Sequence, residues 1–557
     1  MKYESTILKR LIDTYGVVGN PRYISEIIKE FIVRGKECFP NLFTYQADWL
    51  AHIDEFGLNP TYTVSYTGQS IYAPNTLERP VKSAILTGST LVNLNKNPNI
   101  YKQLKVGESR YYVLDIPYNI KANQPFTLKL NVKESTLSQQ IMMKTVHEDN
   151  TNTFDILKEG SETGIVNRLF TKGKDVNNIE IYIQATETGI AIIENIILLE
   201  GDYTNVDIPY FEGMQSVKMP VLTTTGKNLY PNLHKNAKSN TYIKVEQLTN
   251  GLKTTVIDNS KVNVPLNVGT IVLKPNTYYT ISSKIEVQNG VKKQQGRIRI
   301  YELTGDKSIG YLASDVTKLS FLTKNSSTYG IAFYPISNEG IDAENIGHTC
   351  TWTNIQIEEG VIATSYEPYK SNILTVNEDV TLRGIGDVQD TMDCLTGEVT
   401  QRISEINFEK FEIHGYNSIM FDGYYCAIIA IKNKASSPQI ITNLVPTQGF
   451  KAGLDCGIYS NPDNLVVFKK GATLDEIKNL VSELVIQYEL ATPIIKTVDL
   501  TILDQNGQNV KQLMSFNGGT HFNTTSLEGS PLPVVSVSVE TDLEEILMMC
   551  SLEGNTL

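Results

Sequence analysis

Histidine and cysteine are scarce in this chain of 557 residues, which has six of each. No cysteines form a C-x-x-C pair, and their spacing matches neither a zinc site nor a compact disulfide framework. His348 and Cys350 are two residues apart and would face the same side of a strand. Such an isolated pair is more often a turn histidine beside a core cysteine than a metal site, because free cysteine behaves as a small apolar residue. The sequence therefore predicts no bound metal.

Motifs that carry catalysis are absent from the sequence. It contains no G-x-S-x-G nucleophile elbow, no phosphate-binding Walker loop and no H-E-x-x-H zinc motif. A glycosidase needs two carboxylates across a sugar bond, and the 61 acidic residues do not single out such a pair. We therefore expect a protein that is not an enzyme and has no catalytic residues or cofactor. A particle-bound polysaccharide depolymerase remains an alternative.

Positive charge is also in deficit. The formal net charge is -12 and no block of lysine and arginine occurs. Binding to nucleic acid or to an anionic membrane surface needs clustered positive charge, so neither is an expected partner. No apolar run approaches the roughly 18 residues of a membrane helix. The N-terminus lacks the apolar core of a signal peptide, so we expect synthesis in the cytoplasm without export or membrane insertion.

What the sequence does contain is typical of strands and turns. It has 29 tyrosines and many segments rich in Thr, Val, Ile and Asn. Residues 535–539 (VSVSV) alternate with a period of two, as in a strand with one buried face. Helical spacing is confined to the first part of the chain and to two capping-box sequences. These begin at Thr473 and Thr541, and each has a glutamate three residues later.

An internal repeat organises the middle of the chain. Residues 195–201 (NIILLEG) with a following Pro-Tyr match residues 354–360 (NIQIEEG) with a following Pro-Tyr, at an offset of 159. Upstream, a Lys-x-Asn turn at 121–123 matches another at 274–276, at an offset of 153. One loop insertion explains the difference, since loops absorb insertions cheaply. The repeat predicts two β-sandwich modules, each with a closing strand that ends at a glycine.

Several strings resemble a known group of proteins. They are VKSAILTG at 81–88, LEGDYT at 199–204, TTGKNLY at 224–230, ATSYEPY at 363–369, TGEVT at 396–400 and YELATP at 488–493. These strings resemble minor structural proteins of phages and prophages of Firmicutes, of the receptor-binding tail-fibre or baseplate type, with carbohydrate-binding-like jelly-roll modules. The resemblance implies a virion protein that assembles with other tail or baseplate proteins, attaches to host cell-surface glycan and forms a homotrimer. A purely structural collar, head-fibre or spacer protein is a further alternative.

Together these patterns predict a mainly β protein of serial β-sandwich (jelly-roll) modules with a short helical N-terminal segment. We expect a helical attachment or oligomerisation segment at 1–58, a linker at 59–80, module 1 at 81–213, a carbohydrate-binding-like module 2 at 214–370, a β-rich domain with one helix at 371–539 and a helical tail at 540–557.

Three aromatic residues near the end of module 2 are the candidate ligand site. Trp352, Tyr366 and Tyr369 lie close together in the sequence, and sugar binding by a sandwich uses exposed rings. The alternative is that Trp352 and Tyr369 are core or latch residues.

Overall fold

The structure is a computed structural model that describes residues 62–541 apart from short gaps, the longest being 289–295, 336–345, 408–416 and 448–455. The helix expected within 1–58 lies outside the described residues. Of the helical tail expected at 540–557, only residues 540 and 541 are described, and they end a strand rather than begin a helix. Both helices otherwise stay predictions. The described part consists mostly of antiparallel strands in face-to-face sheets, which confirms the predicted β-sandwich class.

A central sandwich is built from two antiparallel sheets. One has the order β1 (Tyr62–Gly68), β38 (Val534–Thr541), β3 (Val81–Thr87), β28 (Thr391–Asp393), β29 (Glu398–Asn407), β35 (Val485–Thr497), β32 (Ile440–Thr442). The other has the order β2 (Ser70–Ala73), β37 (Thr520–Thr525), β14 (Val221–Thr225), β24 (Ser371–Val376), β36 (Leu500–Asp504). Leu86, Leu222, Phe522 and Val537 are fully buried in its core. Val535, Val537 and Val539 all point inward, as their alternation predicts.

The central sandwich draws on strands from distant parts of the chain. The first and last described strands pair, with Tyr62 opposite Thr541. Residues 59–80, predicted as a linker, in fact supply β1 and β2, because Ile71 and Ala73 are buried in the shared core. β3, predicted as the start of module 1, also belongs to this sandwich. A small sheet of β25 (Thr381–Leu382), β13 (Met214–Lys218) and β4 (Thr90–Val92) adjoins it.

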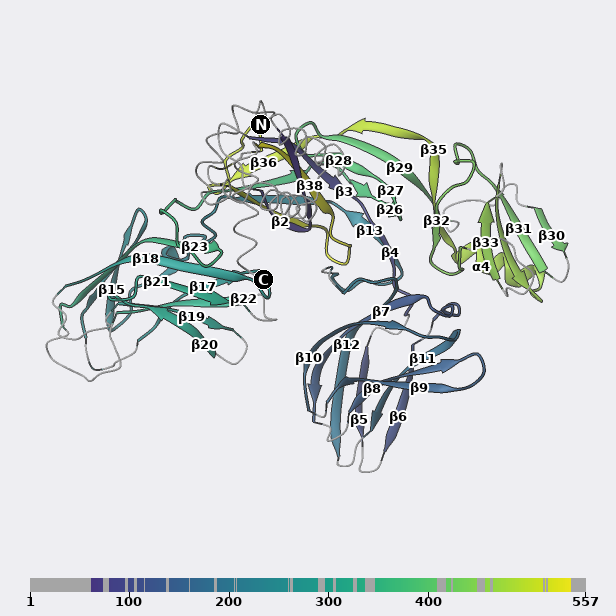
Figure 1. Ribbon diagram of the computed structural model, residues 1–557, viewed down its shortest axis with the longest axis horizontal. Helices are drawn as coiled ribbons and strands as arrows, with labels where there is room; N and C mark the ends of the chain where they lie inside the picture. The colour runs from purple at the N-terminus through teal and green to yellow at the C-terminus, as the bar shows by residue number, and fades with distance from the viewer. Residues whose placement is uncertain are drawn as a thin grey trace, which may run out of the picture.

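Module 1 is an excursion of the chain from the central sandwich (Figure 1). Its first sheet has the order β10 (Gly164–Thr171), β7 (Pro125–Ser135), β12 (Gly189–Glu200), β5 (Ile100–Leu104). Its second has the order β6 (Ser109–Leu114), β11 (Val176–Gln184), β8 (Ile141–His147), β9 (Asn152–Lys158). Eight strands distributed in this way over two sheets form a jelly roll. Alternate residues of both sheets face a shared core, in which Phe126, Leu128 and Ile181 are fully buried.

Module 2 repeats the same topology after the chain has returned through β13 and β14. Its first sheet has the order β15 (Ile243–Leu248), β16 (Gly251–Val256), β23 (Thr349–Glu359), β18 (Tyr278–Gln288), β21 (Lys318–Leu322). Its second has the order β17 (Leu266–Val272), β22 (Thr328–Tyr334), β19 (Arg297–Glu302), β20 (Lys307–Leu312). Strands β16 to β23 therefore match β5 to β12 one by one, with β15 added at an edge. A short 3-10 helix, η3 (Leu233–Asn236), lies before β15.

The repeat anchors of the sequence are equivalent in the structure. Asn123 and Asn276 both adopt left-handed backbone, at φ 63° and 52°, in the turn before the matching strands β7 and β18. The carbonyl oxygens of the closing glycines also have matching partners. Thr127 Oγ1 donates to Gly201 O at 2.7 Å, and Thr280 Oγ1 donates to Gly360 O at 2.8 Å. The predicted duplication is confirmed at the level of individual strands.

A C-terminal subdomain lies beyond the central sandwich, at the far ends of β29 and β35 (Figure 1). It contains the sheet β30 (Asn417–Phe421), β31 (Tyr424–Ala430), β34 (Asn464–Lys470), β33 (Cys456–Ser460) and the helix α4 (Leu474–Glu483). The predicted capping box is formed: Thr473 N donates to Glu476 Oε2 at 2.7 Å, and Glu476 N donates to Thr473 Oγ1 at 3.2 Å. Ile477 and Val481 bury the inner face of α4. A minimal hairpin of β26 (Gly384–Ile385) and β27 (Val388–Gln389) completes the described strands.

Candidate functional site

Trp352 is a core residue of module 2. Its side chain is fully buried, and its indole Nε1 donates to Gly296 O at 2.9 Å. The Phe333 ring meets it edge-on with 5.2 Å between centroids. The alternation along β23 turns this position inward, so Trp352 offers no surface to a sugar, and the core alternative applies to it.

Tyr366 and Tyr369 lie on a segment that folds back along the outside of β23. The backbone N–H of Glu367 donates to Gln356 Oε1 at 2.8 Å, and Glu367 O accepts from Asn228 Nδ2, also at 2.8 Å. Both tyrosines are half-buried. Because Trp352 points into the core, the three residues do not share one surface. A ligand-binding role for the two tyrosines stays a prediction.

The structure places a different set of aromatic side chains on the outer face of module 1, on the sheet β6-β11-β8-β9. The Tyr111 and Tyr182 rings stack with 4.6 Å between centroids, and Phe154 meets Tyr182 edge-on at 6.1 Å. Tyr111 is 47% exposed and Phe154 is 49% exposed. Strand alternation explains this face, since the neighbours of these residues, such as Leu114 and Ile181, are fully buried in the core.

A lysine lies within this aromatic cluster. Lys144 Nζ is 4.4 Å from the centroid of the Tyr111 ring and 3.0 Å from Glu180 Oε2. Tyr182 Oη donates to Gln184 Oε1 at 3.2 Å. The face therefore combines flat rings, which suit the C–H faces of a sugar, with an ammonium, a carboxylate and an amide, which suit its hydroxyls.

The equivalent sheet of module 2 presents the same arrangement. In module 1, Lys144 on β8 is opposite Phe154 on β9; in module 2, Arg299 on β19 is opposite Tyr311 on β20. Tyr311 is 51% exposed. An outward cation beside an exposed ring thus occurs at matching positions in both jelly rolls.

Further contacts order the rings and guanidinium groups of the module 2 face. Arg299 Cζ is 4.8 Å from the centroid of the Tyr301 ring, and Arg297 Cζ is 5.5 Å from that of Tyr311. Tyr301 is opposite Gly330 on β22, where an added Cβ would lie 2.3 Å from Tyr301 Cζ. The glycine therefore allows the tyrosine ring to lie across its neighbouring strand.

Sequence reasoning missed both faces, although a signal was present. Lys144 and Arg299 are 155 residues apart and Phe154 and Tyr311 are 157 apart, between the offsets of the two repeat anchors. Carrying the repeat through the intervening strands would have aligned these residues.

The part of the chain that the structure describes contains no cluster of three His, Cys, Asp or Glu able to hold an ion. His348 Nε2 lies 3.1 Å from Cys350 Sγ, with both residues buried. Burial raises the pKa of the Cys350 thiol, which disfavours the thiolate that a metal would need. The described residues also form no helix that is long and apolar enough to span a membrane.

Comparison with known proteins gives no match to a protein-family model and none to a curated protein sequence. Among solved structures, the N-terminal CBM22-1-CBM22-2 tandem domain of Paenibacillus barcinonensis Xyn10C is 10% identical, with a TM-score of 0.17 over 53% of this chain and 100% of its own. Sulfolobus Turreted Icosahedral Virus is 8% identical, with a TM-score of 0.10 over 46% and 90%. Infectious bursal disease virus VP2 is 10% identical, with a TM-score of 0.11 over 88% and 83%. TM-scores this low give no information about the role of this chain.

Proposed function

We propose that this chain is a structural protein of a bacteriophage tail fibre, tail tip or baseplate that binds host cell-surface glycan through the outer faces of its two jelly rolls. One observation carries the glycan-binding part: equivalent sheets of both modules present an exposed ring next to a cation, at Phe154 and Lys144 and at Tyr311 and Arg299. The virion setting rests on the resemblance of the sequence to phage structural proteins.

The chemistry of the two faces fits a polymeric sugar. Exposed rings that hold their position in a sheet can stack on sugar rings without losing much conformational freedom. A single shallow face of this kind binds weakly, but two faces in one chain and several chains in one particle multiply the affinity. The proposal therefore includes a homotrimer, attachment to other virion proteins through residues 1–58 and no catalytic step.

Sedimentation of the purified full-length chain with cell-wall polysaccharides from a panel of Firmicutes tests this proposal. Phe154→Ala and Tyr311→Ala should each weaken binding by roughly threefold to tenfold, the loss expected for one aromatic contact. Together they should abolish co-sedimentation.

Tyr278→Ala is the matched control, since Tyr278 is 49% exposed on the other sheet of module 2. It should bind like the unmodified chain. Unchanged binding by the double variant would contradict the proposed faces, and failure of the unmodified chain to bind any wall polymer would favour a spacer without ligand. Release of reducing sugar, lost on substitution of one Asp or Glu, would instead establish a depolymerase.

The subunit number is tested by the mass of the purified chain in solution. At micromolar concentration, the measured mass should be that of three chains. A monomer under these conditions would contradict the homotrimer and leave the two glycan faces to be judged on their own.

A further inference from the structure

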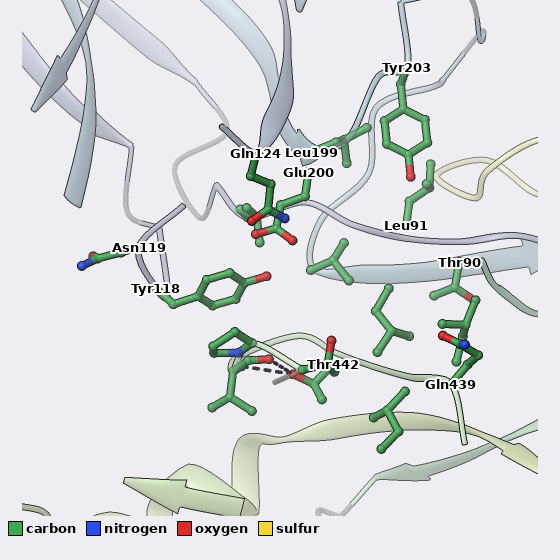
Figure 2. A pocket seen from close by; sticks show the side chains of 18 residues that line it. Thr90, Leu91, Tyr118, Asn119, Gln124, Leu199, Glu200, Tyr203, Gln439 and Thr442 are labelled. Atoms are coloured by element: carbon green, nitrogen blue, oxygen red, sulfur yellow. Dashed lines mark hydrogen bonds between the residues drawn. The ribbon is translucent and has the colours of Figure 1, made fainter. Parts of the chain in front are cut away.

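A polar pocket lies between module 1 and the segment 439–447, which includes β32 of the central sandwich (Figure 2). Its volume is about 330 Å³, at the lower end of the range for small-molecule sites. Module 1 contributes Tyr118, Gln124 and Glu200, whereas Gln439 and Thr442 line the opposite wall. These residues do not belong to the aromatic faces described above.

The Glu200 carboxylate lies on the module 1 side of the pocket. The Tyr118 hydroxyl and the Gln124 amide lie near it (Figure 2). Burial raises the pKa of Glu200, and burial followed by the nearby Glu200 raises the pKa of Tyr118. Glu200 is the last residue of β12, and Gly201 follows it in left-handed backbone at φ 107°, where the chain turns away. Glu200 therefore lies at the turn where β12 ends, and its carboxylate lines the pocket (Figure 2).

Module 2 uses the equivalent glutamate in a different way. Glu359 ends β23 as Glu200 ends β12, and its Oε2 lies 3.1 Å from Lys274 Nζ. The matching lysine of module 1, Lys121, pairs instead with Asp175 at 2.7 Å. Among the residues that the structure describes, no lysine or arginine pairs with Glu200, so its charge is not neutralised by the contact that its counterpart makes.

We infer that this pocket binds a neutral monosaccharide or disaccharide whose hydroxyls donate to the Glu200 carboxylate and whose ring packs on Tyr118. The Glu200 carboxylate repels anionic ligands and accepts hydrogen bonds from vicinal hydroxyls. Gln124 and Gln439 add amide donors and acceptors, which suit a ligand with many hydroxyls better than an apolar one. This site is independent of the module faces, because the two share no residue.

Because two parts of the chain line the pocket, a bound ligand should affect how these parts move relative to each other. A ligand that contacts both walls stabilises the arrangement in which they face each other, by an amount that grows with ligand concentration over Kd. Saccharide binding should therefore reduce the motion between module 1 and the part of the central sandwich that carries β32.

Saturation-transfer NMR of the full-length chain tests the inference. The probes are glucose, galactose, mannose, rhamnose and N-acetylglucosamine, together with their common disaccharides. At least one should receive saturation. Glu200→Gln, which keeps the shape of the side chain, should weaken its binding by about tenfold or more, as expected on loss of a charged acceptor.

Tyr118→Phe is a second, milder variant that carries the test if Glu200→Gln does not fold. Tyr210→Phe is its matched control in the same module, because Tyr210 Oη donates to Glu212 Oε1 at 2.9 Å, away from the pocket. Glu359→Gln is the control for the loss of a strand-end carboxylate. Both controls should bind the probes normally.

The double variant Phe154→Ala with Tyr311→Ala separates this site from the proposed function. It should retain the saturation signal that Glu200→Gln loses. Loss of the signal in that double variant, equal binding by Glu200→Gln and the unmodified chain, or no saturation of any probe would each overturn the inference.

Discussion

Asn195 and Asn354 occupy the same position in the two jelly rolls and adopt the same unusual backbone, at φ 58° and φ 53°. Each lies at a register shift of the closing strand, where β12 meets β7 and where β23 meets β18. Asparagine tolerates left-handed backbone better than other residues with a side chain, and the bulge turns the strand as it passes over the core. This explains why the matching motifs in the two closing strands both begin with asparagine.

Replacing Asn354 with alanine should destabilise module 2 by about 1–2 kcal/mol, the cost of left-handed backbone for an ordinary residue. The side chain also accepts from Asn250 Nδ2 at 3.2 Å, which alanine would lose. Asn354→Gly should recover most of the backbone part of the loss. Trp352 fluorescence during denaturant unfolding, in a Trp49→Phe background, reports on module 2 directly because Trp352 lies in its core. Equal stability of the alanine and glycine variants would contradict the backbone explanation.

A second pair of equivalent asparagines fastens each module to the segment that follows its closing strand. Asn228 Nδ2 donates to Ile355 O at 3.1 Å and to Glu367 O at 2.8 Å. In module 1, Asn93 Nδ2 donates to Ile196 O at 3.3 Å and to Phe211 O at 3.0 Å. Both side chains are buried.

Asn228→Asp should therefore cost about 2–4 kcal/mol of module 2 stability at neutral pH. A carboxylate cannot donate to the two carbonyls, which would be left buried without partners. The control is Asn276→Asp, at an exposed turn where aspartate also tolerates left-handed backbone. Trp352 fluorescence measures both variants, and a loss of stability no larger than that of the control would show that the amide donors of Asn228 are dispensable.

Acid should destabilise the central sandwich through His521. Burial, followed by the nearby Lys274 charge, lowers the pKa of His521 from its ordinary 6.5 to about 3. The Tyr72 ring lies 4.7 Å away, and Glu359 Oε2 lies 3.9 Å from its Nδ1. His521 takes up a proton near pH 6.5 in the unfolded chain but not in the folded one. Its contribution to the free energy of unfolding is therefore fully present above pH 6.5 and is lost as the pH falls from 6.5 towards 3.

The expected loss is roughly 1.4 kcal/mol per pH unit within that window. Calorimetric unfolding at several pH values between 4 and 7 measures it. His521→Gln should unfold at a lower temperature at pH 7 but lose less between pH 7 and pH 4. The same pH slope in both proteins would assign the acid sensitivity to other groups, such as His234, whose pKa burial lowers to about 4.

Local patterns in the sequence predicted the parts of the fold that depend on neighbouring residues. The capping box at Thr473, the inward valines of β38 and the Lys-x-Asn turns each depend on a few residues in a row, and all are present in the structure. The pairing of β1 with β38 joins segments almost at opposite ends of the described chain. Strand periodicity identifies a buried face but does not identify the partner strand, so the central sandwich was divided incorrectly between a linker and separate domains.

Trp352 was assigned to the candidate site for a related reason. Trp352 was chosen because it is a rare aromatic near two tyrosines, but its inward position depends on where the bulge at Asn354 sets the phase of β23. Neither Phe154 nor Tyr311 stands out in the sequence as a single residue. Only their correspondence across the repeat would have singled them out.

Two glycines of module 2 should respond very differently to alanine. At Gly251 an added Cβ would lie 1.9 Å from Trp352 O, a backbone atom of the adjacent strand, so β16 and β23 must separate. At Gly330 the added Cβ would lie 2.3 Å from Tyr301 Cζ, the far end of a side chain that can rotate away. Gly251→Ala should therefore cost about 3 kcal/mol or more, as a strained core substitution does, whereas Gly330→Ala should cost about 1 kcal/mol.

Gly330→Ala then becomes a test of the module 2 face that leaves the module folded. In the unmodified chain the Arg299 guanidinium lies 4.8 Å from the Tyr301 ring. Displacing that ring from β22 removes this contact, so the guanidinium is no longer held by the ring. Polysaccharide co-sedimentation should weaken by about as much as in Tyr311→Ala, while Trp352 fluorescence shows a folded module. Unchanged sedimentation of a folded Gly330→Ala variant would exclude the Tyr301 ring from the glycan-binding surface, because the substitution removes the space in which that ring lies.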